Sequence, residues 1–322
     1  MQYNVMILSA GRRVELIKRF KRAAKELGIE SKIIGVDVTD LAPALYFCDD
    51  KELIPRIDDE RYIDSLLDVC KKYDVKLMVP TIDTELTKIS ENVNRFKELG
   101  VMVNISNPDV ISICRNKIST SKWLEKNNID APRLITDDDL NNGNYEFPLF
   151  IKPLDGSSSI NAFRVNDQKA LGFFKDYVPN PIIQEMVLGE EYTIDVFCDF
   201  NSNPITIVPR KRLAVRAGEV LKGVIDKDRD IINAAKGLVL KLRPFGHITI
   251  QCIKSNDGKI IILEINPRFG GGAPMSIDAG ADSPKNLFRL LLGEKLEYNE
   301  DYTNGLYFAR FDDAIMVDKN EK

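Results

Sequence analysis

The chain has 322 residues, with 45 lysines and arginines, 49 aspartates and glutamates and one histidine, giving a net charge of −4 at pH 7. This near balance argues against bulk attraction to nucleic acid or to an anionic membrane surface. A single histidine, His247, excludes zinc sites built on histidine pairs. The length and the 44% hydrophobic content suffice for roughly two or three domains with buried cores.

The cysteines and the N-terminal segment indicate in which cellular compartment the protein is expected. Five cysteines are widely spread and form no C-x-x-C pair, which is typical of reduced thiols. The N-terminal segment lacks the basic and long apolar regions of a signal peptide, and no apolar run approaches the ~18 residues of a membrane span. We therefore expect a soluble cytoplasmic protein.

The first hundred residues alternate between strand-like and helix-like patterns. Strands are predicted at 5–9, 32–36 and 76–80, and helices at 14–27, 62–73 and 84–99. This alternation predicts a parallel sheet covered on both faces. Ligands of such sheets bind at the carboxyl ends of the strands. The segments expected on the ligand side are Ser9 to Arg13, Asp37, and Pro80 to Glu85.

Beyond residue 107 the pattern changes. A helical stretch with one break is predicted from Pro108 to about Lys126, and further helices at 229–242 and 284–292. Strands with hairpin turns predict an α+β region with antiparallel sheets. These strands are expected at 149–152, 160–165, 182–185, 192–200, 205–208, 247–254 and 259–266. The predicted domains are residues 1–110, 111–188 and 189–322.

Several familiar nucleotide and hydrolase motifs are absent. The first strand is followed by Ser9-Ala-Gly-Arg-Arg13 rather than by G-x-G-x-x-G, which disfavours a Rossmann-type cofactor. G-x-x-x-x-G-K-[ST], H-E-x-x-H and G-x-S-x-G do not occur either. The functional residues are therefore sought in the second half.

A predicted hairpin brings three oxygen donors together. Asp257-Gly258 reads as a two-residue hairpin turn, with Asn256 opposite Lys259. In that register Gln251 lies across from Glu264, and Thr249 across from Asn266, while Leu263 and Ile265 pack on the other face. Gln251, Glu264 and Asn266 thus converge as ligands for a hard divalent cation that also holds substrate phosphates. A merely polar exposed strand face is the alternative.

Residues after this strand extend the predicted site. Arg268 could fork onto a phosphate or a carboxylate. The glycines at 270–272 are expected to line the acceptor site, although such loops also serve as tight connections.

Two earlier segments could contact a nucleotide. Lys152 ends an apolar strand and enters a Gly/Ser loop, which together could form a phosphate clamp. Taken alone, this segment is better explained as a surface lysine before a turn. Gln184 to Leu188 could present backbone to an adenine edge, and a carboxylate after Gly189 could accept from ribose hydroxyls. Alone, this second segment indicates no more than an interdomain hinge.

In order and spacing, these segments resemble the ATP-grasp superfamily over nearly the whole chain. The likeness is greatest to members related to single half-modules of the carbamoyl phosphate synthetase large subunit, and Glu264-Ile-Asn-Pro-Arg268 is its most specific part. Residues 5–14 resemble the start of the family's pre-ATP-grasp domain. The resemblance implies magnesium ligands at Gln251, Glu264 and Asn266 and catalytic roles for Arg268 and Lys152. It implies nucleotide contacts at Lys117, Lys152, Gly156, Ser157, Ser158, Gln184, Glu185, Val187 and Glu191.

The resemblance also implies a reaction. ATP with Mg²⁺, or Mn²⁺ as a substitute, would phosphorylate a carboxylate, and an amine would attack the acyl phosphate to give an amide. The chain is too short for a complete carbamoyl phosphate synthetase and shows no glutaminase cysteine pattern. Activation of bicarbonate or carbamate and a catalytically inactive nucleotide-binding regulator remain the alternatives. The expected partners are small-molecule acids and amines, with neither nucleic acid nor membrane, and a homodimer is a candidate assembly.

Some residues have weaker assignments. Arg210 belongs to a basic run that could face the phosphates or simply be solvated, and His247 is better explained as a structural histidine than as a site residue. The candidate substrate contacts are Gly11, Arg12, Glu85, Arg210 and Gly271.

Overall fold

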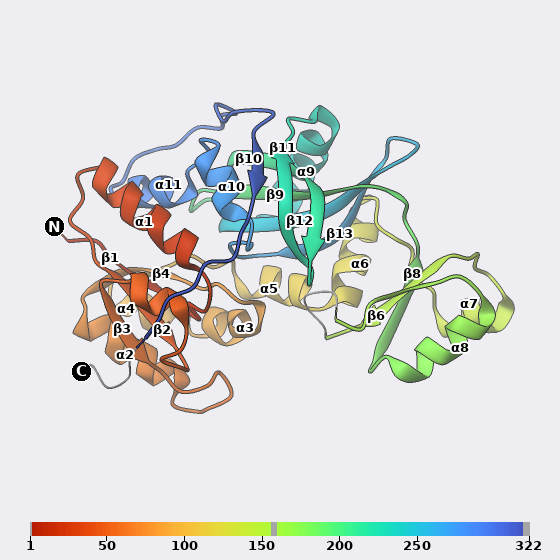
Figure 1. The fold of residues 1–322 in the computed structure, drawn as a ribbon, viewed down its shortest axis with the longest axis horizontal. Coiled ribbons are helices and arrows are strands. Elements are labelled where there is room, and N and C mark those ends of the chain that lie inside the picture. Colours follow the sequence, from red (N-terminus) through yellow and green to blue (C-terminus); the bar gives the residue numbers. More distant parts are fainter. Residues whose placement is uncertain (1, 156–159, 318–322) are drawn as a thin grey trace.

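A computed structural model describes residues 2–155 and 160–317. Its N-terminal part is a five-stranded parallel sheet in the order β3-β2-β1-β4-β5 (Figure 1). The strands are β1 (Asn4–Ile7), β2 (Ile33–Asp37), β3 (Asp50–Leu53), β4 (Val75–Val79) and β5 (Met102–Val103). The accompanying helices are α1 (Val14–Glu26), the 3-10 helix η1 (Pro43–Phe47), α2 (Tyr62–Lys72), α3 (Asp83–Glu91) and α4 (Val93–Glu98).

Both faces of this sheet are covered because β1 is apolar on both sides. Val5 and Ile7 share a core with α1, whereas Met6 and Leu8 share one with α2, α3 and α4. The core on the α1 side also contains Phe269 and Phe288 from the C-terminal part of the chain. The N-terminal sheet is therefore joined to the rest of the molecule through a common core.

The middle of the chain forms a small separate layer at the right of Figure 1. Its antiparallel sheet has the order β7-β6-β8, formed by β6 (Leu149–Pro153), β7 (Phe163–Val165) and β8 (Pro181–Glu185). Helices α7 (Asp137–Asn142) and α8 (Gln168–Tyr177) accompany it, after α5 (Pro108–Arg115) and α6 (Lys117–Lys126). Leu149, Ile151 and Leu171 belong to a core of its own.

The C-terminal part is a six-stranded sheet in the order β13-β12-β9-β10-β11-β14, in which neighbouring strands all run antiparallel. Its strands are β9 (Gly189–Cys198), β10 (Pro204–Arg216), β11 (Glu219–Ile225), β12 (Gly246–Ser255), β13 (Ile260–Asn266) and β14 (Tyr307–Ala309). Helix α9 (Arg229–Leu242) shares a core with one face, and α10 (Ala273–Asp278) and α11 (Ser283–Leu291) join the core of α1. The predicted fold class, a parallel α/β domain followed by antiparallel α+β sheets, is confirmed.

Two predicted helices are interrupted by asparagines. The helix predicted at 84–99 divides at Asn92, whose side-chain amide donates to Lys88 O at 2.9 Å. The break predicted between Pro108 and Lys126 falls at Asn116, which accepts from the backbone N–H of Ile118 and of Ser119 and so caps α6. The predicted domain division at 110 and 111 falls within α5, and that at 188 and 189 falls where β9 begins; the three-domain division stays a prediction.

The register of the β12–β13 hairpin differs from the prediction near its turn. Lys254 pairs with Ile260, one residue away from the partner that a two-residue turn would give. An irregularity after Gln251 restores the predicted pairs Gln251–Glu264 and Thr249–Asn266. Because of this irregularity the core-facing residues of β13 are Ile262 and Ile265, so the expected packing of Leu263 beside Ile265 was wrong.

Candidate active site

A cleft of about 520 Å³ lies between the carboxyl edge of the N-terminal sheet, the large sheet and the β6 loop. It is lined by four groups of residues. These are Arg13 with Thr81 to Thr84; Arg115, Lys117, Leu154 and Asp155; Thr193, Arg210, Arg212 and Gly218 to Val220; and Thr249, Gln251, Glu264, Asn266, Arg268 and Gly270 to Gly272.

The three predicted metal ligands line this cleft together. Gln251 Nε2 donates to Glu264 Oε2 at 3.3 Å, and Asn266 lies two residues further along the same strand. Gln251 Oε1 accepts from Arg212 at 2.9 Å. Within residues 2–155 and 160–317 no cluster of three His, Cys, Asp or Glu side chains could hold a metal by itself. One carboxylate and two amides suit a Mg²⁺ ion whose remaining ligands are phosphate oxygens and water.

Lys117 and Lys152 approach the same carboxylate from the β6 side. Lys117 Nζ donates to Leu154 O at 2.6 Å. Burial lowers the pKa of both lysines, that of Lys152 to about 8, and the charge of Glu264 partly opposes the shift in each case. A lysine in such surroundings gains from an anionic partner. The two ammonium groups therefore suit the phosphates of a nucleotide.

The predicted adenine and ribose contacts follow β8. Gln184 is buried and pairs with Phe150 of β6, whereas Glu185 is exposed and forms an ion pair with Arg133. Val187 is partly buried in the connection to β9, and Glu191 lies 3.6 Å from Arg212. The predicted phosphate-loop residues Gly156, Ser157 and Ser158 lie outside the described residues.

Arg268 links the large sheet to the N-terminal domain. Its guanidinium forms an ion pair with Asp83 at the start of α3 and donates to Asn266 Oδ1 at 3.3 Å. Its buried Nε has no hydrogen-bond partner among the described residues. Arg268 is thus held between the two parts of the cleft, with one buried donor that makes no hydrogen bond to the described residues.

Arg210 is committed to a buried ion pair. It is 1% exposed and donates to both oxygens of Asp195, at 2.7 and 3.2 Å. Burial alone would raise the pKa of Asp195, but the charge of Arg210 and the contact with His247 hold it below its usual range. Ser276 also donates to this carboxylate. This placement favours a structural role for Arg210 over a contact with phosphates.

His247 is a buried structural side chain. Its ring stacks on Phe269 with centroids 4.1 Å apart, and Nδ1 lies 3.0 Å from Ser283 Oγ. Asp195 lies 3.6 Å from Nε2. His247 is absent from the residues lining the cleft, as expected for a histidine of the core.

Only some of the other predicted substrate contacts line the cleft. Gly271 lines the cleft, but Gly11 and Arg12 do not, and Arg13 does. The backbone N–H of Gly11 donates to Asp37 at 2.9 Å, and Arg12 is largely exposed. Glu85 is fully buried and accepts from Ser9 and from the backbone of Thr81, so it supports the loop behind the cleft.

Arg13 and Asp83 line the cleft and fall within the two segments expected on the ligand side of the N-terminal sheet. Arg212 also lines it and belongs to the basic run that begins at Arg210 on β10. Sequence reasoning missed Glu219, which carries no local motif and reaches the cleft wall only through the fold.

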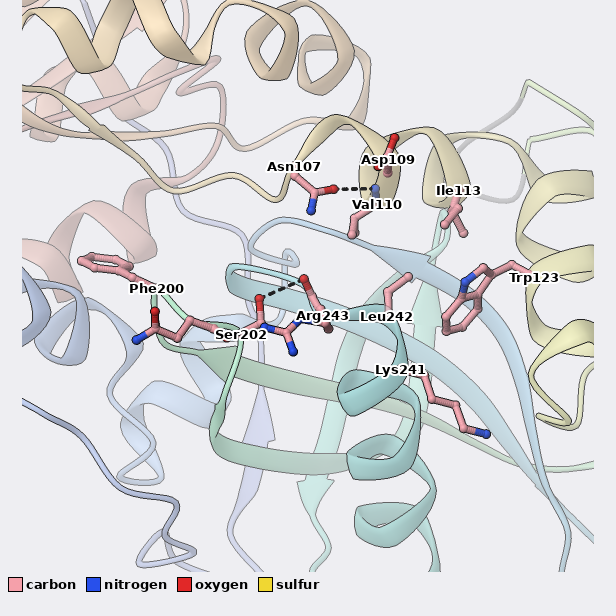
Figure 2. A pocket seen from close by; sticks show the side chains of 11 residues that line it. Asn107, Asp109, Val110, Ile113, Trp123, Phe200, Ser202, Lys241, Leu242 and Arg243 are labelled. Atoms are coloured by element: carbon pink, nitrogen blue, oxygen red, sulfur yellow. Dashed lines mark hydrogen bonds between the residues drawn. The ribbon is translucent and has the colours of Figure 1, made fainter.

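A second cavity of about 530 Å³ lies between α5, α6, the β9–β10 turn and the end of α9 (Figure 2). Several of its polar groups serve local structure: Asn107 caps α5 by accepting from Val110 N–H, and Ser202 donates to Arg243 O at 3.0 Å. None of the predicted site residues lines it.

Two regions of the chain match known families. Residues 5–104 match the family described as the PylC-like N-terminal domain, and residues 178–313 match the family described as ATP-grasp in the biosynthetic pathway with Ter operon. The family that residues 178–313 match is thus an ATP-grasp family. A curated relative, D-alanine–D-alanine ligase B of Clostridium perfringens, is 23% identical over 271 residues, covering 72% of this chain and 86% of that protein.

Solved structures share the ATP-grasp fold. The biotin carboxylase domain of Hydrogenobacter thermophilus 2-oxoglutarate carboxylase, in complex with MgADP, ADP and bicarbonate, matches with a TM-score of 0.77 and 15% identity over 95% of this chain and 74% of that one. The N5-carboxyaminoimidazole ribonucleotide synthetase of Thermotoga maritima matches with a TM-score of 0.68 and 18% identity over 93% and 78%. Among residues 2–155 and 160–317, no helix is long and apolar enough to cross a bilayer.

Proposed function

We propose that this protein is a Mg²⁺- and ATP-dependent ligase that joins a carboxylate to an amine. The γ-phosphoryl group leaves ADP and bonds to a carboxylate oxygen. The amine nitrogen then bonds to the acyl carbon as the C–O bond to phosphate breaks. The products are an amide, ADP, phosphate and the protons that the ammonium group releases.

The observation that carries this proposal is the convergence of one predicted set on one cleft. Lys117, Gln251, Glu264, Asn266 and Arg268 all line it, although they come from α6, β12 and β13. Lys152 adds a second ammonium group close enough to interact with Glu264. These are the residue types that phosphoryl transfer requires, and they include no histidine.

The residues of the chain act by binding and by neutralising charge. Lys117 and Lys152 would hold phosphate oxygens, and Arg268, fixed by Asp83, would hold the carboxylate in line with the γ-phosphorus. Gln251, Glu264 and Asn266 would hold the metal, whose positive charge would offset the negative charge of the transferred phosphoryl group. Gln184 to Val187 and Glu191 would contact the adenine and ribose.

A screen of paired acids and amines tests the proposal. The protein is incubated with Mg-ATP and each pair, ADP release is followed, and the product mass is determined. We expect ADP release that needs both partners and a product with the mass of their amide. Release with bicarbonate or carbamate alone would favour the alternative activation, and neither nucleotide binding nor ADP release with any pair would contradict the ligase.

We also propose a cytoplasmic, homodimeric enzyme. All five cysteines are free thiols, which suits a reducing compartment, and the biotin carboxylase domain that shares this fold is described as a dimer. Light scattering at two protein concentrations would test the dimer, and a monomer mass at both would contradict it.

A further inference from the structure

The second cavity, of about 530 Å³, is within the size range of small-molecule sites. None of the described residues that line it also lines the cleft. Figure 2 shows Phe200 and Trp123 on opposite sides of this cavity, with Leu242 and Arg243 between them. The cavity therefore presents aromatic rings on two sides and a guanidinium group between them.

The charged side chains of this cavity are mainly cationic. Lys241 and Arg243 lie at the end of α9, and Asp109 is the only carboxylate among the described residues of the lining. Lys241 Nζ donates to Asn127 O at 2.6 Å, and Arg243 Nη2 donates to Asn201 O at 3.4 Å. Both acceptors are uncharged, and neither cation forms an ion pair in the part of the chain that the structure describes. An anionic group in the cavity would therefore meet two positive charges that no ion pair neutralises.

The backbone at Arg243 has a conformation that favours glycine. Arg243 is the C-cap of α9 with φ 54° and ψ 54°, the left-handed region in which a helix usually ends on glycine. Ser202, which donates to Arg243 O at 3.0 Å, also has a positive φ, of 66°. Residues other than glycine have a higher conformational energy in this region, and such residues are concentrated at ligand sites. A function of the guanidinium group in the cavity would account for an arginine at this position.

Two helices connect this cavity with the cleft. Helix α5 ends at Arg115, which lines the cleft, whereas Ile113 of the same helix lines the cavity. Helix α6 begins at Lys117 in the cleft and carries Trp123 in the cavity, about 9 Å further along the helix axis. A molecule in contact with Trp123 would therefore rest against the helix that positions one of the proposed phosphate lysines.

We propose that the second cavity is an effector site for a small anion that carries a planar ring, and that its occupation changes the affinity of the cleft for nucleotide. The ring would pack against Trp123, and the anionic group would bind Arg243 and Lys241. An aromatic carboxylate and a nucleoside monophosphate share this chemistry. The inference goes beyond the proposed ligase function and rests on it only for the presence of nucleotide in the cleft.

Trp123 is the only tryptophan of the chain, so its fluorescence reports on this cavity. The protein, in the presence of excess MgADP, is titrated with benzoate, with AMP, GMP, CMP and UMP, and with the neutral counterparts benzamide and the four nucleosides. We expect a saturable change in fluorescence with at least one anion and none with its neutral counterpart, and the responding anion identifies the group as a carboxylate or a phosphate. No saturable change with any anion, or an equal change with the neutral compounds, would overturn the inference.

Arg243→Gly separates an effect on binding from an effect on stability. The variant removes the guanidinium group, and glycine suits the left-handed backbone, so the unfolding temperature should equal or exceed that of the wild type. Because hydrogen bonds to charged groups contribute about 1.5–3 kcal/mol, the Kd of the anion should rise by about 10- to 100-fold. Asp74→Gly, at an exposed left-handed position between α2 and β4, is the matched control and should leave this Kd unchanged. An unchanged Kd in Arg243→Gly would overturn the proposed site.

Calorimetry then tests the effect on nucleotide binding. MgADP is titrated into the wild type and into Arg243→Gly, each with and without the anion at a concentration that saturates the wild type. We expect the anion to change the Kd of MgADP by at least about fivefold in the wild type and by less in the variant. An anion that binds at Trp123 and leaves the Kd of MgADP unchanged would overturn the effector role. No MgADP binding with or without the anion would contradict the ligase function and the coupling together, whereas the fluorescence titration tests the cavity by itself.

Discussion

Glu264 is the residue on which the proposed metal site depends. It supplies the only carboxylate of the three donors, and it interacts with Gln251, Lys117 and Lys152. Replacing it with alanine would leave two neutral amide ligands beside two ammonium groups.

We predict that Glu264→Ala lowers Mg²⁺-dependent turnover by at least about 100-fold, since loss of even indirect metal contacts costs about 10- to 100-fold. Its circular dichroism spectrum and unfolding temperature should remain those of the wild type. Glu297→Ala, at an exposed position, is the matched control. Wild-type turnover of Glu264→Ala would contradict the metal assignment.

The lowered pKa of Lys152 predicts that nucleotide binding is coupled to the uptake of protons. With a pKa lowered to about 8, the free lysine is increasingly deprotonated as the pH rises above 8. Phosphate favours the charged form, so nucleotide binding between pH 8 and 9 should take up protons, and affinity should fall as the pH rises. Calorimetry in two buffers of different ionisation enthalpy measures this uptake.

Lys152→Arg should bind nucleotide without this uptake, because its guanidinium stays protonated over the whole range. Equal binding heats in both buffers for the wild type would contradict the linkage.

At the scale of elements, the side chain of Asp195 connects neighbouring strands and a helix beside the cleft through hydrogen bonds. It lies on β9 and contacts Arg210 of β10, Thr249 of β12 and Ser276 of α10. Thr249 in turn donates to the backbone carbonyl of Arg268 at 3.2 Å. The buried carboxylate thus supports the segment that carries the cleft arginine.

We predict that Asp195→Asn lowers the free energy of unfolding by about 3–5 kcal/mol, because it leaves the buried guanidinium of Arg210 without a counter-charge. Glu190→Gln removes the carboxylate that pairs with Lys211, the neighbouring residue on β10, and should cost less than about 1 kcal/mol because that pair is exposed. Urea unfolding of both variants compares them. Equal losses of unfolding free energy in the two variants would show that burial of the Asp195–Arg210 pair does not increase its contribution to stability.

Elements with a periodic core face were predictable from the sequence, and polar or edge elements were not. Helix α1 buries Leu16, Ile17 and Phe20 at helical spacing, and its expected range matches closely. Strand β3 has alternating intermediate and exposed residues and was missed, as were β11 and β14, because these segments lack an apolar run. The pairing of Gln251 with Glu264 was predicted, but through a turn register that the structure does not have.

The residues of the candidate site were also only partly predictable from the sequence. Donors close in sequence on β12 and β13 could be paired by register, whereas Arg13 and Glu219 meet only through the packing of α1 against α10 and α11. No spacing rule relates positions so far apart in the sequence.

At the scale of the whole molecule, the N-terminal sheet and the large sheet share one core. Phe20 of α1 packs edge-on against Phe269 and Phe288, with centroids 6.0 and 6.2 Å away. The β6–β7–β8 layer has its own smaller core. The two sheets should therefore unfold together, and the small layer should open separately.

Hydrogen exchange followed by mass spectrometry measures this difference. We predict that peptides of α8 and β7 exchange before those of α1 and α10, and that nucleotide slows exchange in β6 and β8. Phe269→Ala should lower the stability of both large sheets by about 3–5 kcal/mol. Exchange of the N-terminal sheet ahead of α10 would contradict a shared core.

The burial of the sole histidine gives the molecule an internal reporter. His247 stacks on Phe269, next to the arginine that spans the cleft, and 1% of it is exposed. A single imidazole yields one set of ring proton resonances, which the aromatic ring current of Phe269 would displace. One resolved signal in a one-dimensional spectrum of unlabelled protein could therefore follow rearrangement of this loop during substrate titration.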